Sequence, residues 1–276
     1  MARIISYVEK DCFIHRLSGL TKLIFFILWT ITSMLTYDTR VLAAMIVISF
    51  LCFFLSRTDW KQVRSIFGFI MIFLILNIIA IFIFSPYEGC KIYNSRTDLL
   101  HIKGNYTFTA EQLFYELNII LKYCTIVPSV FMFITSTNPS EFAASLNRIK
   151  LPYTVSYSVA IAMRYVPDVQ SDFNKIKNAQ EARGIEMSSK ANIFSRLINM
   201  GAILFPLIFS SMEKIDSVSN AMELRGFGKK PTRTWYSARR LKKGDWLVII
   251  ITIIFLSLAL FVTYRDGNRF WNPFVS

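Results

Sequence analysis

The feature that most constrains this chain is a run of nineteen almost uninterrupted apolar residues, from Trp246 to Tyr264. A run of this length matches the hydrocarbon core of a bilayer, where a helix satisfies its own backbone hydrogen bonds. Further runs extend from about Ile66 to Phe84, Leu23 to Leu35, Val41 to Leu55 and Gln112 to Thr135. With 54% hydrophobic residues and a mean hydropathy of +0.43, the chain is too apolar for a soluble globule. We therefore predict an all-α polytopic membrane protein with about five transmembrane helices.

The basic residues beside these runs indicate an orientation. The 57–64 loop carries three basic residues and one acidic residue, whereas the 85–111 segment carries three of each. Because cytoplasmic loops are enriched in Lys and Arg, we expect the N-terminus and the 57–64 loop inside and the 85–111 segment outside. Five crossings then leave the C-terminus outside. The same rule explains the net charge of +13, and since no nucleic-acid-binding motif is present, no nucleic-acid partner is predicted.

Three regions of different character follow one another. We predict a transmembrane region with four spans at 1–137, a cytoplasmic module at 138–243, and a final span with a tail at 244–276. The module opens with Asn138-Pro139-Ser140-Glu141, a helix start with Asn at the N-cap and Pro at N1, and it contains 17 Lys or Arg against 8 Asp or Glu. Its apolar stretch, Met200 to Phe209, is too short to cross a bilayer. We predict an amphipathic helical layer along the inner membrane surface, with this stretch as a buried or shallowly inserted helix.

One heptapeptide occurs twice in this module. Residues 179–185 read Ala-Gln-Glu-Ala-Arg-Gly-Ile and residues 221–227 read Ala-Met-Glu-Leu-Arg-Gly-Phe, with four of seven positions identical at a separation of 42. Upstream of each copy, apolar residues recur at spacings of three and four, as in an amphipathic helix. Glycine tolerates the left-handed backbone just past a helix end, so each glycine is expected to stop its helix. Each helix is therefore tipped with one arginine, Arg183 or Arg225.

The sequence leaves two interpretations of these tips open. A basic residue in the last turn of a helix is common, because the helix dipole favours a cation there, so each tip could be an ordinary cap. The repetition of Glu, Arg and Gly favours a shared docking role. Glu181 and Glu223, two residues before the arginines, could steady the guanidinium, pair with a partner or face solvent.

The residues of common catalytic and metal sites are absent from the sequence. The two histidines, His15 and His101, fall on opposite sides of the predicted membrane, and the four cysteines form no Cys-x-x-Cys pair. Gly226-Phe227-Gly228-Lys229 lacks the first glycine of a phosphate-binding loop, so the chain is not expected to hydrolyse ATP. We predict a non-catalytic subunit without metal or cofactor.

A secondary transporter or channel is the alternative function. Such proteins place polar residues near the bilayer midplane, and this chain offers Asn77 and Lys122. Lys122 fits two positions: within the membrane facing protein, or in a helix that begins outside the hydrocarbon core.

Over nearly its whole length, and most specifically from about Thr137 to Phe227, the chain resembles a known family, the transmembrane T component of energy-coupling factor (ECF) transporters, which serve bacterial uptake of vitamins, cobalt or nickel. The resemblance rests on Asn138-Pro139-Ser140-Glu141, Leu146, Leu151-Pro152-Tyr153, Arg164-Tyr165-Val166-Pro167, and above all Ala182-Arg183-Gly184 and Leu224-Arg225-Gly226. The chain departs from the family at Leu224, where alanine is commoner. Near the N-terminus it keeps only Leu17, Thr21 and Lys22 of the family's pattern.

The resemblance implies partners for each part of the chain. The two arginine motifs would end coupling helices that dock into grooves on two ABC-type ATPase subunits, which hydrolyse the ATP. The apolar helical surface would hold a separate substrate-binding S component in the plasma membrane of a prokaryote. The implied coupling residues are Ala182, Arg183, Gly184, Leu224, Arg225 and Gly226, with Glu181, Glu223, Arg164 and Pro167 in support.

Overall fold

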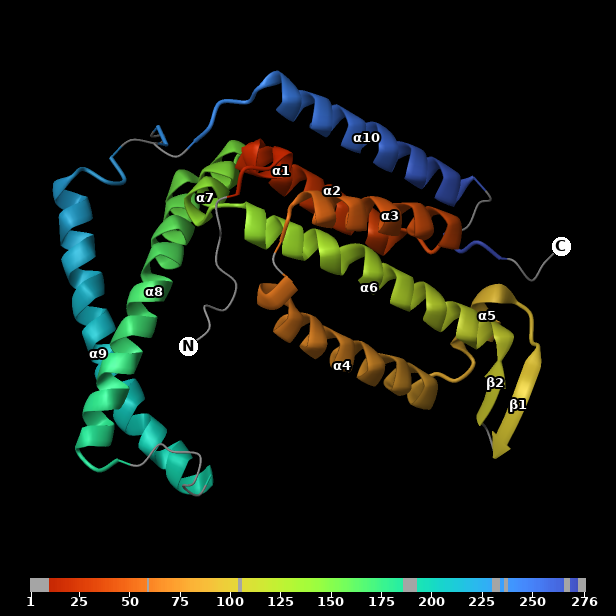
Figure 1. The fold of residues 1–276 in the computed structure, drawn as a ribbon, viewed down its shortest axis with the longest axis horizontal. Coiled ribbons are helices and arrows are strands. Elements are labelled where there is room, and N and C mark those ends of the chain that lie inside the picture. The colour runs from red at the N-terminus through yellow and green to blue at the C-terminus, as the bar shows by residue number, and fades with distance from the viewer. Residues whose placement is uncertain are drawn as a thin grey trace. The chain divides into compact units, whose positions relative to one another are not determined.

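A computed structural model describes residues 10–58, 60–103, 106–185, 193–229, 234–235, 238–265 and 269–272. These residues are mostly helical (Figure 1). Contacts within the chain divide it into two compact units. The first unit comprises Met1–Glu141 and Arg239–Ser276, and the second comprises Phe142–Ala238.

The first unit is built from five long apolar helices, preceded by the short helix α1 (Phe13–Arg16). They are α2 (Gly19–Leu35), α3 (Thr39–Leu55), α4 (Trp60–Phe84), α6 (Ala110–Ser136) and α10 (Lys243–Tyr264). Three of them, α4, α6 and α10, are long and apolar enough to cross a membrane, while α2 and α3 are apolar with 17 residues each. At 1.5 Å per residue, 17 residues span about 26 Å, close to the roughly 30 Å of a hydrocarbon core. The prediction of an all-α polytopic membrane protein is confirmed.

Two clusters of buried apolar side chains hold these helices together. The first joins α2, α3 and α10 through Trp29, Val41, Met45, Leu256 and Ala259. The second joins α3, α4 and α6 through Phe53, Val63 and Phe131. Outside this second cluster α4 is mostly exposed, with Phe69 at 72% and Phe84 at 84%. The face of α4 is therefore available to lipid or to another membrane protein.

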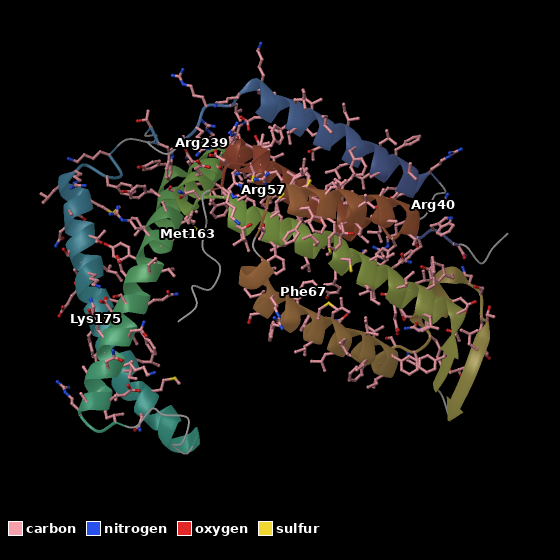
Figure 2. The ribbon with its side chains drawn as sticks, in the orientation of Figure 1. Arg40, Arg57, Phe67, Met163, Lys175 and Arg239 are labelled. Atoms are coloured by element: carbon pink, nitrogen blue, oxygen red, sulfur yellow. The ribbon has the colours of Figure 1, made fainter. Side chains whose placement is uncertain are left out.

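Contacts at the helix ends show which segments share a side of the first unit. Lys10 Nζ donates to the Arg57 carbonyl at 2.6 Å, so Lys10 lies at the same end as the start of the loop after α3. Figure 2 shows Arg57 and Arg40 at opposite ends of α3.

Residues 269–272 lie at the end marked by Arg40. Tyr37 N–H, in the α2–α3 turn, donates to the Arg269 carbonyl at 3.0 Å, and Asn272 Nδ2 donates to the Tyr93 carbonyl at 2.9 Å. Residues 269–272 and Tyr93 of the 85–111 segment therefore share one end, as the charge pattern led us to expect. Which end faces the cytoplasm stays a prediction.

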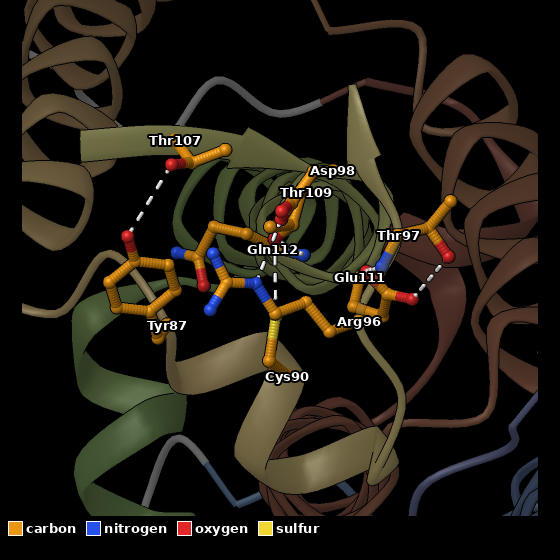
Figure 3. A network of polar contacts seen from close by, with 9 residues as sticks. All are labelled: Tyr87, Cys90, Arg96, Thr97, Asp98, Thr107, Thr109, Glu111 and Gln112. Atoms are coloured by element: carbon orange, nitrogen blue, oxygen red, sulfur yellow. Dashed lines mark hydrogen bonds and ion pairs between the residues drawn. The ribbon is translucent and has the colours of Figure 1, made fainter. Parts of the chain in front are cut away.

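The 85–111 segment is folded, which the sequence did not predict. It forms α5 (Glu88–Tyr93) and an antiparallel hairpin of β1 (Asp98–Lys103) and β2 (Tyr106–Thr109) that leads into α6. Figure 3 shows how polar side chains pack it together. The buried Glu111 carboxylate accepts hydrogen bonds from Thr97 N–H at 3.0 Å and Thr97 Oγ1 at 2.9 Å, and Gly89 N–H donates to Gln112 Oε1 at 2.9 Å. These contacts fasten α5 and the hairpin to the first turn of α6.

The second unit consists of helices that follow the predicted starts. α7 (Pro139–Arg148) is capped by Asn138, whose Oδ1 accepts from Ser140 N–H at 3.0 Å, and α8 (Tyr153–Ala182) begins after Pro152. The predicted helix starts are confirmed. α9 (Ile193–Leu224) contains the apolar stretch from Met200 to Phe209 in its first half. The apolar stretch is therefore part of a longer helix that continues through Pro206, and its insertion into the membrane surface stays a prediction.

Candidate functional site

The first copy of the heptapeptide ends α8 with a defined hydrogen-bonded cap. Gly184 N–H donates to the Glu181 carbonyl at 3.0 Å, and Ile185 N–H donates to the Gln180 carbonyl at 3.0 Å. This pair of bonds is the Schellman motif, which satisfies carbonyls that a helix end would leave open. Gly184 has φ of +89°, so its left-handed role is confirmed.

The second copy repeats this cap at the end of α9. Gly226 N–H donates to the Glu223 carbonyl at 2.8 Å, Phe227 N–H donates to the Met222 carbonyl at 2.9 Å, and Gly226 has φ of +66°. The two copies thus share a backbone geometry as well as four residue types. Each arginine directly precedes its left-handed glycine, so the same type of cap fixes the backbone next to it.

Both tips present their arginine on an exposed surface. Arg183 and Arg225 are exposed, as are their neighbours Ala182 and Leu224. Leu224 is 90% exposed, so the residue that departs from the family pattern adds apolar surface beside the second guanidinium. The tips thus combine a multidentate hydrogen-bond donor with an accessible approach.

The supporting residues named from the sequence are only partly gathered at the tips. Glu181 Oε1 lies 3.7 Å from Lys177 Nζ on the same helix, an exposed ion pair of the kind that contributes less than about 1 kcal/mol. Glu223 is exposed beside the second tip. Arg164 and Pro167 are exposed in the middle of α8, and at 1.5 Å per residue Pro167 lies about 24 Å along the helix from Arg183.

The two tip helices pack against each other in opposite directions. Gln180 Nε2, at the end of α8, donates to the Ala202 carbonyl in the first half of α9 at 3.1 Å. Asp172 of α8 forms an ion pair with Lys214 further along α9. The 30 residues of α8 correspond to about 45 Å, so antiparallel packing puts the two tips toward opposite ends of a long helix pair. The two arginines are therefore far apart along the pair.

The helix pair has charged and apolar contacts along its length. The Lys214 ammonium donates to Asp172 and lowers the pKa of that carboxyl below its ordinary value of 3.8, while the pKa of Lys214 is raised. Both groups are therefore charged at neutral pH. Beside them lies a groove of about 490 Å³, whose apolar lining includes Ile161, Tyr165, Val169, Ile215, Val218 and Met222.

A buried polar cluster in the first unit was missed by sequence reasoning. Asp245, in the first turn of α10, accepts from Ser18 N–H at 2.8 Å, Thr21 Oγ1 at 2.9 Å and Lys242 N–H at 2.8 Å. Lys22 Nζ donates to the Ser136 carbonyl at the end of α6 at 2.6 Å. Thr21 and Lys22 are two of the three residues that keep the family's N-terminal pattern, and this was the available signal. The cluster ties the ends of α2, α6 and α10 together.

Lys122 lies beside the turn between α2 and α3. Its Nζ donates to the Met34 carbonyl at 3.0 Å and lies 3.1 Å from the centre of the Tyr37 ring. One turn earlier in α6, Asn118 Oδ1 accepts from Thr39 Oγ1 at 2.8 Å. The first turns of α6 therefore extend beyond the ends of α2 and α3. This geometry favours the interpretation in which α6 begins outside the hydrocarbon core.

Comparisons with known proteins cover nearly the whole chain. The family model described as CbiQ, cobalt transport protein, matches residues 10–236. Curated proteins described as energy-coupling factor transporter transmembrane protein EcfT are similar along their full length. The one from Streptococcus thermophilus is 27% identical, covering 92% of this chain and 96% of the relative. The one from Thermotoga maritima is 28% identical, with 94% and 93% covered, and the one from Staphylococcus aureus is 27% identical, with 95% and 96% covered.

Proposed function

The chain belongs to the cobalt transport protein family, and we propose on this premise that it is the transmembrane T component of an ECF transporter. In this role it is a membrane scaffold that catalyses no reaction itself. Two ABC-type ATPase subunits hydrolyse ATP, and a separate S component binds the vitamin or metal. The observation that carries the proposal is the repetition of one cap geometry at two exposed arginine tips.

The proposed coupling step uses the α8–α9 pair as a rigid connector. Each ATPase subunit offers a groove with carboxylate or carbonyl acceptors, and one arginine enters each groove. Arginine suits this contact because its planar fork donates several hydrogen bonds in fixed directions and is always charged. The separation of the tips along helices of about 45 Å supports one tip per subunit. When ATP draws the two subunits together, the tips move with them and displace the helix pair.

The membrane part of the proposal concerns the S component. Exposed apolar side chains of α4, including Phe69 and Ile72, offer a surface on which a membrane partner packs without a polar pathway. The chain then holds the S component while the S component selects the substrate. We further propose that the N-terminus and the tips are cytoplasmic and that the C-terminus is external, because the 138–243 region carries the basic excess of a cytoplasmic segment.

The test is charge reversal at the two tips in the assembled transporter. Each lost guanidinium contact costs roughly 2–5 kcal/mol, because acceptors in the groove are left unpaired. Either Arg183→Glu or Arg225→Glu should weaken pull-down of the ATPase subunits, and the double variant should abolish both pull-down and ATP-dependent uptake. Arg183→Lys and Arg225→Lys should restore little, because an ammonium does not reproduce the fork.

The control for this test is Arg148→Glu. Arg148 is another exposed arginine in the last turn of a helix of the same unit, so it matches the charge change without touching a tip. We expect parental assembly and uptake from it. Parental uptake by the double tip variant would leave the tips as ordinary helix caps.

Reconstitution of the chain alone separates the proposal from a secondary transporter. In liposomes without partners it should move no substrate. Lys122, one of the two polar residues that suggested a transport pathway, is engaged by Met34 at the end of α2 and by Tyr37 in the turn that follows. Saturable uptake by the single subunit would support the secondary-transporter function instead.

A further inference from the structure

The two heptapeptides differ at three positions, and two of these are half-buried in both copies. In both copies the shared Ala, Glu and Arg are exposed. The second position, Gln180 or Met222, and the seventh position, Ile185 or Phe227, are half-buried in both copies. Both of these positions differ in residue type between the copies. The shared side chains thus lie on the outer surface of each tip, and these differing ones anchor it.

The first tip is anchored by a polar contact to the neighbouring helix. Gln180 Nε2 donates to the Ala202 carbonyl at 3.1 Å, and Ile185 follows the cap. Between residues 174 and 204 the sequence holds a single aromatic residue, Phe194. This stretch therefore lacks the aromatic residues that a ring cluster beside the first tip would need.

The second tip is anchored by such a cluster. The Phe227 ring lies 4.8 Å from the Tyr157 ring and 5.5 Å from the Tyr153 ring, both in the first turns of α8. The centre of the Trp235 ring lies 5.7 Å from that of Tyr153 and 6.1 Å from that of Tyr157. Its Nε1 donates to Asn147 Oδ1 in α7 at 3.1 Å. Aromatic pairs at these separations attract one another beyond the burial of their area.

Phe227 is placed to act on Arg225 through the backbone. The Phe227 N–H donates to the Met222 carbonyl, which closes the cap. The Phe227 ring packs against Tyr157, so the chain directly after the left-handed Gly226 is held against α8. The backbone of Arg225 is thus fixed between the last turn of α9 and the ring cluster. We propose that Phe227, with Tyr153, Tyr157 and Trp235, positions the Arg225 tip before it meets its ATPase subunit.

This inference rests on the proposed function and deepens it. Both tips present a guanidinium, but the first tip is held by a polar contact and the second by aromatic rings. A tip that is already ordered loses less conformational freedom on docking, so removing the ring should lower affinity although the guanidinium remains.

A double-mutant cycle tests whether Phe227 acts through Arg225. The affinity of the purified ATPase subunit pair is measured by titration onto the full-length chain in nanodiscs. Phe227→Ala should weaken binding about tenfold, a change within the range expected for releasing an ordered segment. In an Arg225→Ala background the same change should have less than about a twofold effect, whereas in an Arg183→Ala background it should keep its full effect.

Two further variants separate positioning from folding. Phe227→Tyr retains the ring and should bind within about twofold of the parent. Ile185→Ala changes the matched position in the first copy. It should change the binding affinity by the same factor in the parent and in the Arg225→Ala background, because it acts on the other tip.

The outcomes distinguish this inference from the function on which it rests. If Arg225→Ala binds as tightly as the parent, the proposed function fails, and the positioning role fails with it. If Arg225→Ala is weak but Phe227→Ala either has no effect or weakens binding equally in every background, the proposed function stands and the positioning role is refuted. Loss of binding in Phe227→Tyr as large as in Phe227→Ala also refutes it.

Discussion

Asp245 offers a direct test of how the first unit is held together. Its carboxylate is 3% exposed and accepts three hydrogen bonds, two from the start of α2 and one from Lys242 N–H at the start of α10. In Asp245→Ala all three donors lose their acceptor. In Asp245→Asn the remaining oxygen can still accept from Ser18 and Thr21, but the amide NH₂ then faces another N–H donor.

The size of the effect follows from these contacts. A hydrogen bond to a charged group contributes about 1.5–3 kcal/mol, and a buried donor left unpaired costs about 1–3 kcal/mol. Ser18 and Thr21 are buried, whereas Lys242 is exposed and its N–H can turn to water. We therefore expect Asp245→Ala to lower the free energy of unfolding by about 3–5 kcal/mol and Asp245→Asn by about 1–2 kcal/mol. At roughly 2–4 °C per kcal/mol, the alanine variant should unfold roughly 6–20 °C below the parent.

The assay is thermal unfolding in detergent with a dye that fluoresces on reacting with newly exposed thiols. Cys12 is buried in the parent and precedes α2, so it reports on this end of the unit. Asp216→Ala removes an exposed carboxylate from α9 and should change the midpoint by less than about 2 °C. A midpoint for Asp245→Ala within 2 °C of the parent would show that Asp245 does not fasten α10 to α2.

Three further predictions concern other parts of the chain. Gly89→Ala should destabilise the 85–111 segment, because its Cβ would lie 2.4 Å from a carbonyl oxygen of the first turn of α6. As pH falls toward and below the ordinary Asp pKa of 3.8, the contact between α8 and α9 at Asp172 and Lys214 should loosen, since the lowered pKa of Asp172 means that its pair with Lys214 is complete above that range and lost below it. In a cysteine-free background, Lys91→Cys should react with an impermeant thiol reagent in intact cells, and Asp11→Cys should react only after permeabilisation.

Each of these predictions has a matched comparison. Gly68→Ala, on a helix position with nothing within 4 Å of the new Cβ, should leave stability unchanged, and equal melting of the two glycine variants would contradict the close packing. Spin-label distances between α8 and α9 should respond to pH less in Asp172→Asn than in the parent. The reverse labelling pattern of the two cysteines would overturn the orientation and the cytoplasmic position of both tips.

Local patterns in the sequence predicted the helices and their ends. Five apolar runs matched five helices because length and composition alone decide whether a segment can satisfy its backbone in lipid. Asn138, Gly184 and Gly226 marked helix ends because capping depends on residues within one turn. These signals needed no knowledge of distant contacts.

Contacts between distant residues could not be predicted in the same way. Asp245 meets Ser18 across 227 positions, and nothing near either residue names the other. The fold of the 85–111 segment depends on Glu111 and Gln112 facing α5 and the hairpin, a tertiary arrangement without a periodic signal. At the candidate site the two arginine tips were predictable, whereas the ring cluster at Phe227 requires α7, α8 and the segment after α9 to meet.

The order of synthesis matters for the polar contacts of the membrane helices. Lys122 of α6 donates to Met34, and Asp245 of α10 accepts from Thr21, so each of these later helices finds its polar partner in a segment made earlier. α4 is almost entirely apolar, and a helix of this kind satisfies its own backbone hydrogen bonds in lipid. Because synthesis starts at the N-terminus, the hydrogen-bond partners Met34 and Thr21 are made before α6 and α10, the helices that contact them. Moving α2 behind α10 by circular permutation would leave Lys122 without the Met34 carbonyl, and Asp245 without Ser18 and Thr21, while they insert.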